Sequence, residues 1–119
     1  MYYTDTHEWI AIHGNQGTVG ITSYAQQELG DIVYVQLPKV GQKVAAGEEI
    51  CVLESTKAAA DVYAPVSGIV SAINEEVRNM PGKINQAAET TGWLFQLTLS
   101  QPSETKKLLS LSEYRALLE

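Results

Sequence analysis

The chain has 119 residues, an apolar content of 45% and a formal net charge of −6. This length suits one domain, which buries about two thirds of the surface of its unfolded chain around one core. The apolar content excludes a disordered chain. No apolar stretch approaches the ~20 residues that span a bilayer, and no stripe of Lys and Arg indicates nucleic-acid binding. The acidic balance suits a protein that docks onto several partners by complementary charge.

The sequence shows no export signal, disulfide or metal site. Residues 1–5 contain neither a basic segment nor an Arg- and Ser-rich leader, which predicts a cytoplasmic protein. Cys51 stands alone, so no intrachain disulfide can form, and its place in an apolar run predicts a small buried side chain. His7 and His13 have no ligand spacing with a cysteine or a paired acid, so we predict no metal site.

The first two strands are predicted at residues 7–12 and 18–22, two runs with several β-branched side chains. The segment between them, Gly14-Asn15-Gln16-Gly17, consists almost entirely of strong turn formers. We therefore expect the chain to begin with a hairpin of two antiparallel strands.

A short helix is expected directly after this hairpin, over residues 23–29. Ser23-Tyr24-Ala25-Gln26 has the form of a capping box, and Gly30 suits the residue that ends a helix. Before the C-terminal region we expect no other helix, apart from a turn or two near residues 74–77.

A pattern of glycine, strand, glycine, aliphatic residue, glycine and strand then appears twice. The first copy runs from Gly30 to Leu53 and the second, with insertions, from Gly68 to Leu97. Two similar halves favour a pseudo-symmetric sandwich of two small sheets, because short strands with frequent Gly and Pro are typical of all-β domains. The last strand alternates, which predicts one buried face that is formed by Trp93, Phe95, Leu97 and Leu99.

Between the two halves lies a segment of small residues, Glu54-Ser55-Thr56-Lys57-Ala58-Ala59-Ala60-Asp61. Residues 50–53 before it and 62–64 after it are predicted strands, so the segment forms a hairpin with Lys57 at or near its tip. Alanine is a poor turn former, and the hairpin prediction therefore rests on the flanking runs. Lys57 is either an ordinary surface lysine or an amine that its long stem and small neighbours offer to another enzyme.

The chain from Pro102 onward is predicted to be helical. Residues 103–109 form a short, turn-rich piece, and Ser110-Leu111-Ser112-Glu113 is a capping box that opens a helix. The spacing of Tyr114, Leu117 and Leu118 gives this helix one apolar face, which we expect to pack on the sandwich. The predicted fold is mainly β, a barrel-sandwich hybrid of two small antiparallel sheets. It forms one domain over residues 1–119, with a core over about 3–100 and a helical tail over about 102–119.

From Tyr3 to about Tyr114 the chain carries a series of short motifs in a fixed order. They are His7-Glu8-Trp9, Val19-Gly20-Ile21-Thr22, Tyr24-Ala25-Gln26, Leu29-Gly30-Asp31-Ile32-Val33, Leu37-Pro38, Val40-Gly41, Glu54-Ser55-Thr56-Lys57-Ala58, Pro65-Val66-Ser67-Gly68, Asn74, Asn85 and Gly92-Trp93-Leu94. In this order and spacing they resemble the H-protein family of the glycine cleavage system. The ordered series is far more specific than the motif around Lys57 alone.

The resemblance implies a lipoyl-domain-like fold and a carrier that is not itself a catalyst. The lysine that matches Lys57 would hold lipoic acid as a covalent lipoyl-lysine amide, and the dithiolane would do the redox and group-carrying work. The implied partners are glycine decarboxylase (P protein), which supplies an aminomethyl group, aminomethyltransferase (T protein), which receives it, and dihydrolipoyl dehydrogenase (L protein), which reoxidises the arm. Lipoate-attaching enzymes are further partners. The carrier is expected to be a bacterial, cytoplasmic monomer that binds neither nucleic acid nor membrane.

The resemblance also suggests roles for residues around the lysine. Glu54, Ser55 and Ala58 are candidates for recognition by the lipoyl-attaching enzyme, although Glu54 and Ser55 could equally fix the turn by hydrogen bonds to the backbone. Glu8 and Asp61 are the carboxylates expected in a cleft that shelters the cationic amine of the loaded arm; the alternative is that both are solvated. Two departures from the family pattern, Thr56 before the lysine and the loop at residues 86–91, leave the attachment amine intact but affect the expected docking surface.

Five other interpretations compete with the carrier of glycine cleavage. A biotin-carrier domain usually places its lysine between methionines, which Thr56-Lys57-Ala58 does not. The lipoyl domain of a 2-oxo acid dehydrogenase is shorter and lacks both the His-Glu-Trp strand and the helical tail. An enzyme with Lys57 as a Schiff-base nucleophile would need a buried site, whereas three alanines at a hairpin suggest exposure. A purely structural domain, or a lipoyl donor for the lipoylation of other enzymes, remains open.

Overall fold

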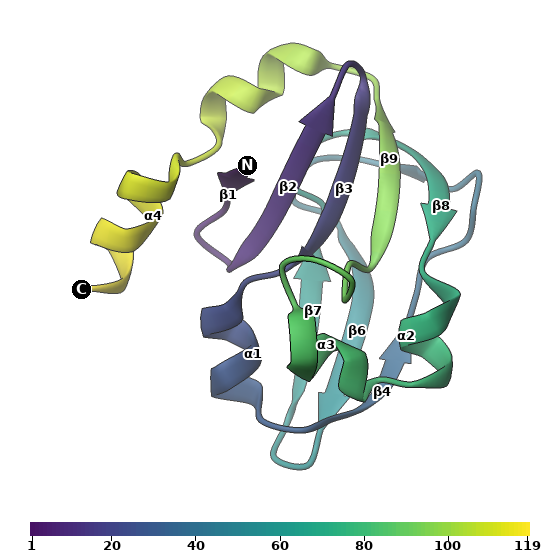
Figure 1. Cartoon of the computed structure of the whole chain (residues 1–119). Coiled ribbons are helices and arrows are strands. Elements are labelled where there is room, and N and C mark those ends of the chain that lie inside the picture. Colours follow the sequence, from purple (N-terminus) through teal and green to yellow (C-terminus); the bar gives the residue numbers. More distant parts are fainter.

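The computed structural model describes residues 1–119 and consists of two antiparallel sheets packed face to face (Figure 1). The larger sheet has six strands in the order β1-β2-β3-β9-β8-β5, and the smaller has three in the order β4-β6-β7. The mainly β prediction with two antiparallel sheets is therefore confirmed. The strands are β1 (Tyr2–Tyr3), β2 (Glu8–His13), β3 (Gln16–Ile21), β4 (Ile32–Gln36), β5 (Lys43–Val44), β6 (Glu49–Ser55), β7 (Ala59–Tyr63), β8 (Gly68–Ile73) and β9 (Phe95–Leu99).

The first hairpin forms where the turn residues predict it. β2 and β3 pair from Glu8↔Ile21 to His13↔Gln16, so Gly14 and Asn15 alone make the connection. Gly14 has a φ of 62°, a conformation that a two-residue hairpin turn requires and that glycine adopts without strain.

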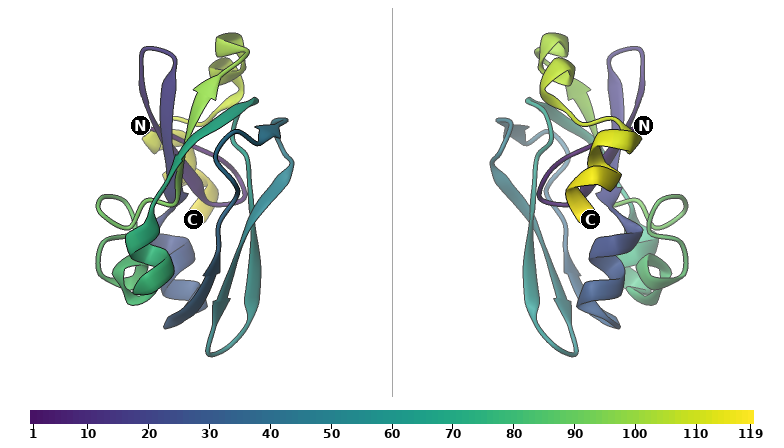
Figure 2. Two further views of the ribbon diagram at one scale, coloured as in Figure 1. Left: turned by 90° about the vertical axis from the view of Figure 1, so that its right-hand side faces the viewer. Right: turned by 90° about the vertical axis from the view of Figure 1, so that its left-hand side faces the viewer.

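The repeated sequence pattern corresponds to a division between the two sheets. The first copy supplies the adjacent strands β4 and β6 of the small sheet, and the second supplies the adjacent strands β8 and β9 of the large sheet. The hairpin after β6 adds β7 to the small sheet, and β5, which lies between β4 and β6 in the chain, crosses to the large sheet and pairs with β8. Figure 2 shows the two layers edge-on, with the chain crossing between them at one end.

The core fills the space between the layers with side chains from both sheets. Ile10 and Phe95 of the large sheet and Leu53 and Val62 of the small sheet are almost fully buried in one cluster of 20 residues. Phe95, Leu97 and Leu99 alternate with half-exposed residues along β9, as expected. Trp93 does not share their face, because β9 begins after it; Leu94 enters the core and Trp93 packs on a second cluster instead.

Helix α1 (Ser23–Leu29) has the predicted bounds but a different cap. Its N-cap is Thr22, whose hydroxyl accepts a hydrogen bond from Ala25 N at 3.3 Å. The Ser23–Gln26 capping box was therefore wrong by one residue, because the preceding threonine already occupies the extended conformation that a cap needs. Gly30 ends the helix with a φ of 78° and donates its N–H to Gln26 O, as predicted.

Two helices lie between β8 and β9. The turn expected near residues 74–77 is the short helix α2 (Glu75–Asn79), capped by Asn74. Helix α3 (Gly82–Ala87) was not expected, and the prediction of no further helix here was wrong. α3 is stabilised by tertiary packing, since Ile84 is fully buried and Gly92 approaches the helix so closely that a side chain there would meet its backbone.

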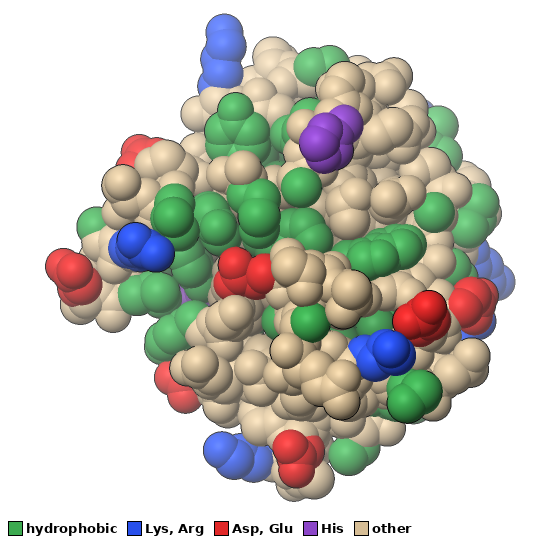
Figure 3. All heavy atoms as spheres, in the orientation of Figure 1, with side chains coloured by type: hydrophobic (Ala, Val, Ile, Leu, Met, Phe, Trp, Pro, Cys, Tyr) green, Lys and Arg blue, Asp and Glu red, His purple; other side chains and the backbone are tan.

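The tail runs along the edge of the large sheet, beside β1. After a 3-10 helix, η1 (Pro102–Lys107), Leu109 exchanges two backbone hydrogen bonds with Tyr3, and helix α4 (Leu111–Leu118) follows. The capping box between Ser110 and Glu113 is present as predicted. Tyr114 packs with Tyr3 and Trp9 in the second buried cluster, and apolar side chains gather where the tail meets the sheet (Figure 3).

The predicted apolar face of this last helix is only partly buried. Leu117 is 51% exposed and Leu118 is 36% exposed, so the expectation that they pack on the sandwich with Tyr114 was wrong. Tyr114 is the one buried residue of α4, and it packs against Tyr3 and Trp9. No helix of the structure has the length and apolar character that crossing a membrane requires.

Candidate functional site

Lys57 lies in the turn that joins β6 to β7, and Ser55 builds this turn. The Ser55 hydroxyl oxygen accepts hydrogen bonds from Lys57 N at 3.1 Å and from Ala58 N at 3.0 Å, and its O–H donates to Ala58 O at 3.1 Å. Ser55 N also donates to Ala58 O at 2.8 Å. One side chain therefore satisfies the backbone of a turn whose alanines cannot do so.

The Lys57 side chain projects from this tip and is free of ionic partners. It is exposed and forms no salt bridge. Its stem lies against Gly30, where an added Cβ would be 3.4 Å from Lys57 Cε. Lys57 also lines none of the three main cavities, which excludes the enclosed site that a Schiff-base lysine needs.

The segment at residues 30–32 supports the tip from one side. Asp31 O accepts a hydrogen bond from Thr56 N at 3.1 Å, next to the lysine. Asn85 of α3 holds the same segment from outside: its Nδ2 donates to Gly30 O at 2.8 Å, and its Oδ1 accepts from Ile32 N at 2.9 Å. This pair of bonds imitates a neighbouring strand and closes the free edge of β4.

Glu54 and Ala58, the other residues expected in an attachment motif, are both exposed beside Lys57. Glu54 lies opposite Ala59 on β7 and Tyr34 on β4, so it faces out from the small sheet. Cys51, three residues earlier, is buried in the core, where burial raises the pKa of its thiol to about 12. The interpretation of Cys51 as a small core side chain is consistent with that environment.

A cleft of about 330 Å³ lies between α1 and β7. The structure brings Glu8 and Asp61 together in it, although they are 53 positions apart in the chain. The remaining walls are mostly apolar, and the cleft is completed by Thr6, His7, Ile21, Tyr24, Ala25, Glu28, Leu29, Leu53, Ala60 and Val62.

Glu8 is a buried carboxylate without a cation. Its side chain is almost fully buried, and it forms no salt bridge. Oε1 accepts hydrogen bonds from the hydroxyls of Thr4 and Thr6, and Oε2 accepts from Tyr63 N at 3.2 Å. Burial raises the pKa of the Glu8 carboxyl, and the two hydroxyls oppose that rise because they stabilise its charged form.

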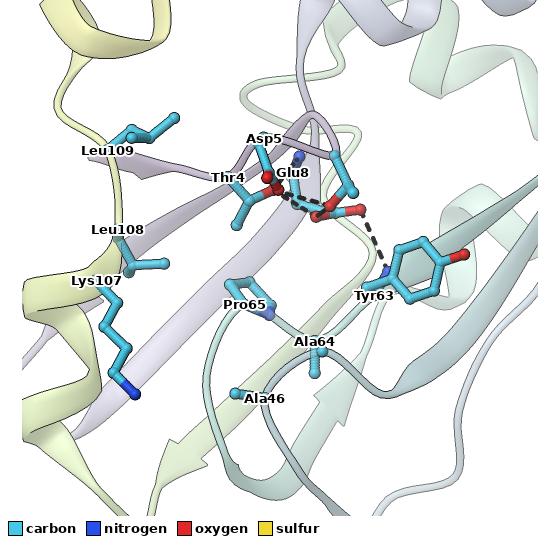
Figure 4. Close-up of a pocket in the computed structure, with 12 residues that line it drawn as sticks. Thr4, Asp5, Glu8, Ala46, Tyr63, Ala64, Pro65, Lys107, Leu108 and Leu109 are labelled. Carbon is cyan, nitrogen blue, oxygen red and sulfur yellow. Dashed lines mark hydrogen bonds between the residues drawn. The ribbon is translucent and has the colours of Figure 1, made fainter.

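A second cavity, of about 560 Å³, opens on the other side of Glu8 (Figure 4). In Figure 4 the carboxylate lies between the hydroxyl of Thr4 and the backbone of Tyr63, at the end of the cavity away from Lys107. Glu8 and Thr6 line both cavities, and Glu8 is the one ionisable residue that the two cavities share.

Asp61 has a different environment. It is exposed at the mouth of the cleft, where it lies opposite Val52 on β6. Its nearest acidic neighbour is Glu49, whose pKa is raised by a hydrogen bond to Asp61 and by repulsion from its charge. The alternative to the cleft prediction, that both carboxylates are solvated, is wrong for Glu8, whereas Asp61 is exposed.

Four residues that bond the groups around this site were not assigned a role from the sequence. Thr4 and Thr6 gave no signal beyond being hydroxyls near Glu8, and Tyr114 was treated only as part of an apolar helix face. Asn85 was quoted as one motif among many, without a role. Asn85 and Tyr114 act across more than 50 positions, so no local spacing could reveal them. Thr4 and Thr6 lie within four positions of Glu8, but their role depends on the burial of Glu8, which only the fold shows.

Comparisons with known proteins agree with this geometry. The family model described as "Glycine cleavage H-protein" matches residues 1–119. The chain belongs to this family. H proteins are the lipoyl carriers of glycine cleavage, and they are not catalysts, so this chain is a non-catalytic carrier component of that system. Members of the family hold the lipoyl group on a lysine.

Individual H proteins cover nearly the whole chain. The glycine cleavage system H protein of Acidobacterium capsulatum is 51% identical over 98% of this chain and 90% of its own length. That of Paramagnetospirillum magneticum is 50% identical over 98% and 94%. The crystal structure of the H protein from Mycobacterium marinum superposes with a TM-score of 0.89 and 39% identity, covering 97% of this chain and 93% of the other.

Proposed function

We propose that Lys57 is the lipoyl attachment site of this H protein. The observation that carries the proposal is the position of the Lys57 amine, exposed and unpaired at the tip of a turn that Ser55 holds in one shape. Small neighbours leave the amine open to a second enzyme, and Gly30 leaves room beside the stem. Once acylated, the nitrogen is a neutral amide that contributes no acid or base.

The residues around Lys57 present the amine rather than react with it. We propose that a lipoate-attaching enzyme reads the exposed Glu54 carboxylate and the small Ala58, while Ser55 fixes the turn between them. The dithiolane of the bound group supplies the redox and group-carrying chemistry. The protein supplies a rigid two-layer base, so that an arm on Lys57 stays near each partner's site at high effective concentration.

Glu8 and Asp61 are proposed to receive the cationic amine that the arm carries between partners. The Glu8 carboxylate has three neutral donors and no cation, so a positive charge that enters the cleft would gain a buried counter-ion. Asp61 adds a second negative charge at the mouth of the same cleft. The apolar walls would exclude water around the amine and slow its loss.

The proposed partners are glycine decarboxylase, aminomethyltransferase, dihydrolipoyl dehydrogenase and a lipoate-attaching enzyme. We propose that the chain acts as one domain and as a monomer in the bacterial cytoplasm. Support comes from the continuous core shared by both sheets, from the single buried cysteine, and from relatives that are mostly bacterial.

Peptide mapping by mass spectrometry tests the attachment site. The protein and a Lys57→Arg variant are each incubated with lipoic acid, ATP and a lipoate ligase that modifies a known acceptor in the same tube. We expect a lipoyl mass increment on the peptide that contains Lys57 and none on the variant. An unmodified wild-type peptide beside a modified acceptor would refute the attachment proposal.

The role of Glu8 is tested on lipoylated protein that glycine decarboxylase has loaded from labelled glycine. The measured quantity is the rate of hydrolytic loss of the label as formaldehyde, with ammonia as the other product. Glu8→Gln removes the charge at nearly constant size. We expect the variant to lose the label about tenfold faster, because a tenfold change in rate corresponds to about 1.4 kcal/mol of ion-pair stabilisation. Unchanged release would refute the proposed role.

A further inference from the structure

The hydroxyl of Tyr114, on the C-terminal helix, joins two walls of the arm cleft. It lies 2.8 Å from Nδ1 of His7 and 2.7 Å from Oγ1 of Thr22. His7 lines the cleft between Thr6 and Glu8, and Thr22 is the N-cap of α1, the opposite wall. A phenol can donate one hydrogen bond and accept another, so both contacts can form together.

We propose that Tyr114 is a positioning residue that holds the His7 loop, residues 4–8, in the conformation in which Thr6 and Glu8 form the arm cleft. The inference rests on the proposed function of that cleft. It gives the tail a role in the carrier site, in addition to packing on the sandwich.

The tail is anchored without this hydroxyl. Leu109 and Tyr3 exchange two backbone hydrogen bonds of 2.8 Å, and the Ser110–Glu113 capping box starts α4. The ring of Tyr114 stacks on that of Tyr3 with centroids 4.9 Å apart and planes 10° apart. A phenylalanine would keep all of these contacts, so the hydroxyl is separable from the packing of the helix.

His7 is the residue that needs to be held. It is the only non-glycine residue of the chain with a positive φ, at 72°. This left-handed conformation is uncommon for any residue other than glycine and persists where surrounding contacts hold it. The backbone of His7 donates to Thr4 O at 3.2 Å and accepts from Thr22 N at 3.0 Å, and its ring lies 4.9 Å from that of Tyr24.

The conformation of His7 sets the direction of both neighbours. Thr6 sends its hydroxyl to Glu8 Oε1, and Glu8 N donates to Thr4 Oγ1 at 3.0 Å, so the two threonines and the glutamate close one small ring of contacts. If His7 leaves the left-handed region, this ring cannot close with Glu8 still paired to Tyr63. Loss of the Tyr114 hydroxyl removes the link between the half-buried His7 imidazole and the buried Thr22 hydroxyl, which then keeps only its bond from Ala25 N, and this favours that departure.

Amide hydrogen exchange on the unloaded protein tests the inference directly. In Tyr114→Phe we expect the amides of Glu8 and Thr22 to exchange about fivefold faster than in the wild type. The loss of one ordinary hydrogen bond shifts the equilibrium for local opening by about this factor. Amides of the small sheet, remote from the tail, should keep their rates. Tyr2→Phe is the matched control, because Tyr2 is exposed and its hydroxyl has no hydrogen bond.

A rescue variant separates a positioning role from a general loss of stability. Glycine adopts a positive φ without strain, so Tyr114→Phe combined with His7→Gly should return the Glu8 and Thr22 amides toward their wild-type exchange rates. Exchange in Tyr114→Phe that matches the wild type would overturn the inference, and so would a double variant that is no better protected than Tyr114→Phe.

The loaded protein connects the inference to the carrier. We expect the labelled cargo to leave Tyr114→Phe about fivefold faster than it leaves Tyr2→Phe. If Glu8→Gln releases its cargo at the wild-type rate while Tyr114→Phe still loosens the loop, the proposed role of Glu8 fails and the positioning of the loop stands. If Glu8→Gln accelerates release and Tyr114→Phe changes neither measurement, the positioning role fails alone.

Discussion

Asn85 is the residue whose removal tests how the lysine-bearing tip is supported. The change is Asn85→Ala, which deletes the two hydrogen bonds from Asn85 to Gly30 O and Ile32 N. Asn85 is half-buried, so water can hydrogen-bond to the backbone groups that the substitution frees. The stability lost is therefore the net contribution of each hydrogen bond, without the additional penalty for a buried group that has no partner. At about 1 kcal/mol for each bond, the free energy of unfolding falls by about 2 kcal/mol.

The assay is urea unfolding of Asn85→Ala beside Asn79→Ala. Asn79 is exposed near the end of α2 and its side chain has no hydrogen bond, so its replacement corrects for the higher helix propensity of alanine. We expect a difference of about 2 kcal/mol between the variants, or about 8 °C in Tm for a chain of this size. The Thr56 amide, which donates to Asp31 O, should also lose protection from exchange.

The reasoning is refuted if the two asparagine variants unfold with free energies within about 0.5 kcal/mol of each other. A second variant sharpens the test. Asn85→Asp keeps an acceptor for Ile32 N but places a carboxylate against the carbonyl of Gly30, so at neutral pH it should be no more stable than Asn85→Ala. Near pH 3, where a protonated carboxyl can donate to that carbonyl, the aspartate variant should become the more stable of the two.

Three further predictions concern the carboxylate, the sheet and the tip. Because the pKa of Glu8 is raised in the folded state, that state binds more protons than the unfolded one, and the stability this gives below pH 4 is lost as pH rises through the folded pKa. In urea titrations from pH 4 to 8, the free energy of unfolding of the wild type should therefore fall relative to that of Glu8→Gln. A difference between the two proteins that stays constant over this range would contradict the prediction. Gly68→Ala should lower the free energy of unfolding by about 3 kcal/mol, because the new Cβ overlaps the Thr98 carbonyl. The control Gly82→Ala, whose Cβ meets no atom, should unfold at the wild-type urea concentration or above it. Ser55→Ala should slow lipoylation about fivefold, because the turn loses the hydroxyl that bonds its backbone. An equal initial rate would show that the turn does not need this hydroxyl.

The strands were predictable because their signals are local. The turn residues Gly14 and Asn15, the alternation along β9 and the apolar runs on both sides of Lys57 each lie within a few positions of one another. The capping box at Ser110 was found for the same reason. The predicted strands on both sides of Lys57 were enough to place it at the tip of a hairpin. The hydrogen bonds that shape this tip come from the side chain of Ser55, and turn propensities alone do not predict them.

The errors have a common physical cause, which is tertiary packing. α3 carries Gly and Asn, which are weak helix formers, and it is helical because Ile84 enters the core and Gly92 fits against it. The end of α4 shows the opposite case: its sequence has helical apolar spacing, but the sheet does not extend far enough to cover Leu117. Glu8 likewise reads as an ordinary strand residue, and only the loop closed by His7 places it in a cavity.

The charges near the tip explain how one surface can serve several enzymes. α1 and the three strands of the small sheet contain no Lys or Arg, but they contain Glu28, Glu49, Glu54 and Asp61. Lys57 is the only cation in that region, and its proposed acylation takes the formal net charge of the chain from −6 to −7. The unmodified and modified forms therefore differ most in local charge at the tip. Charge complementarity raises association rates without demanding one detailed shape, so a face of this kind suits partners that meet the same arm in turn and then release it.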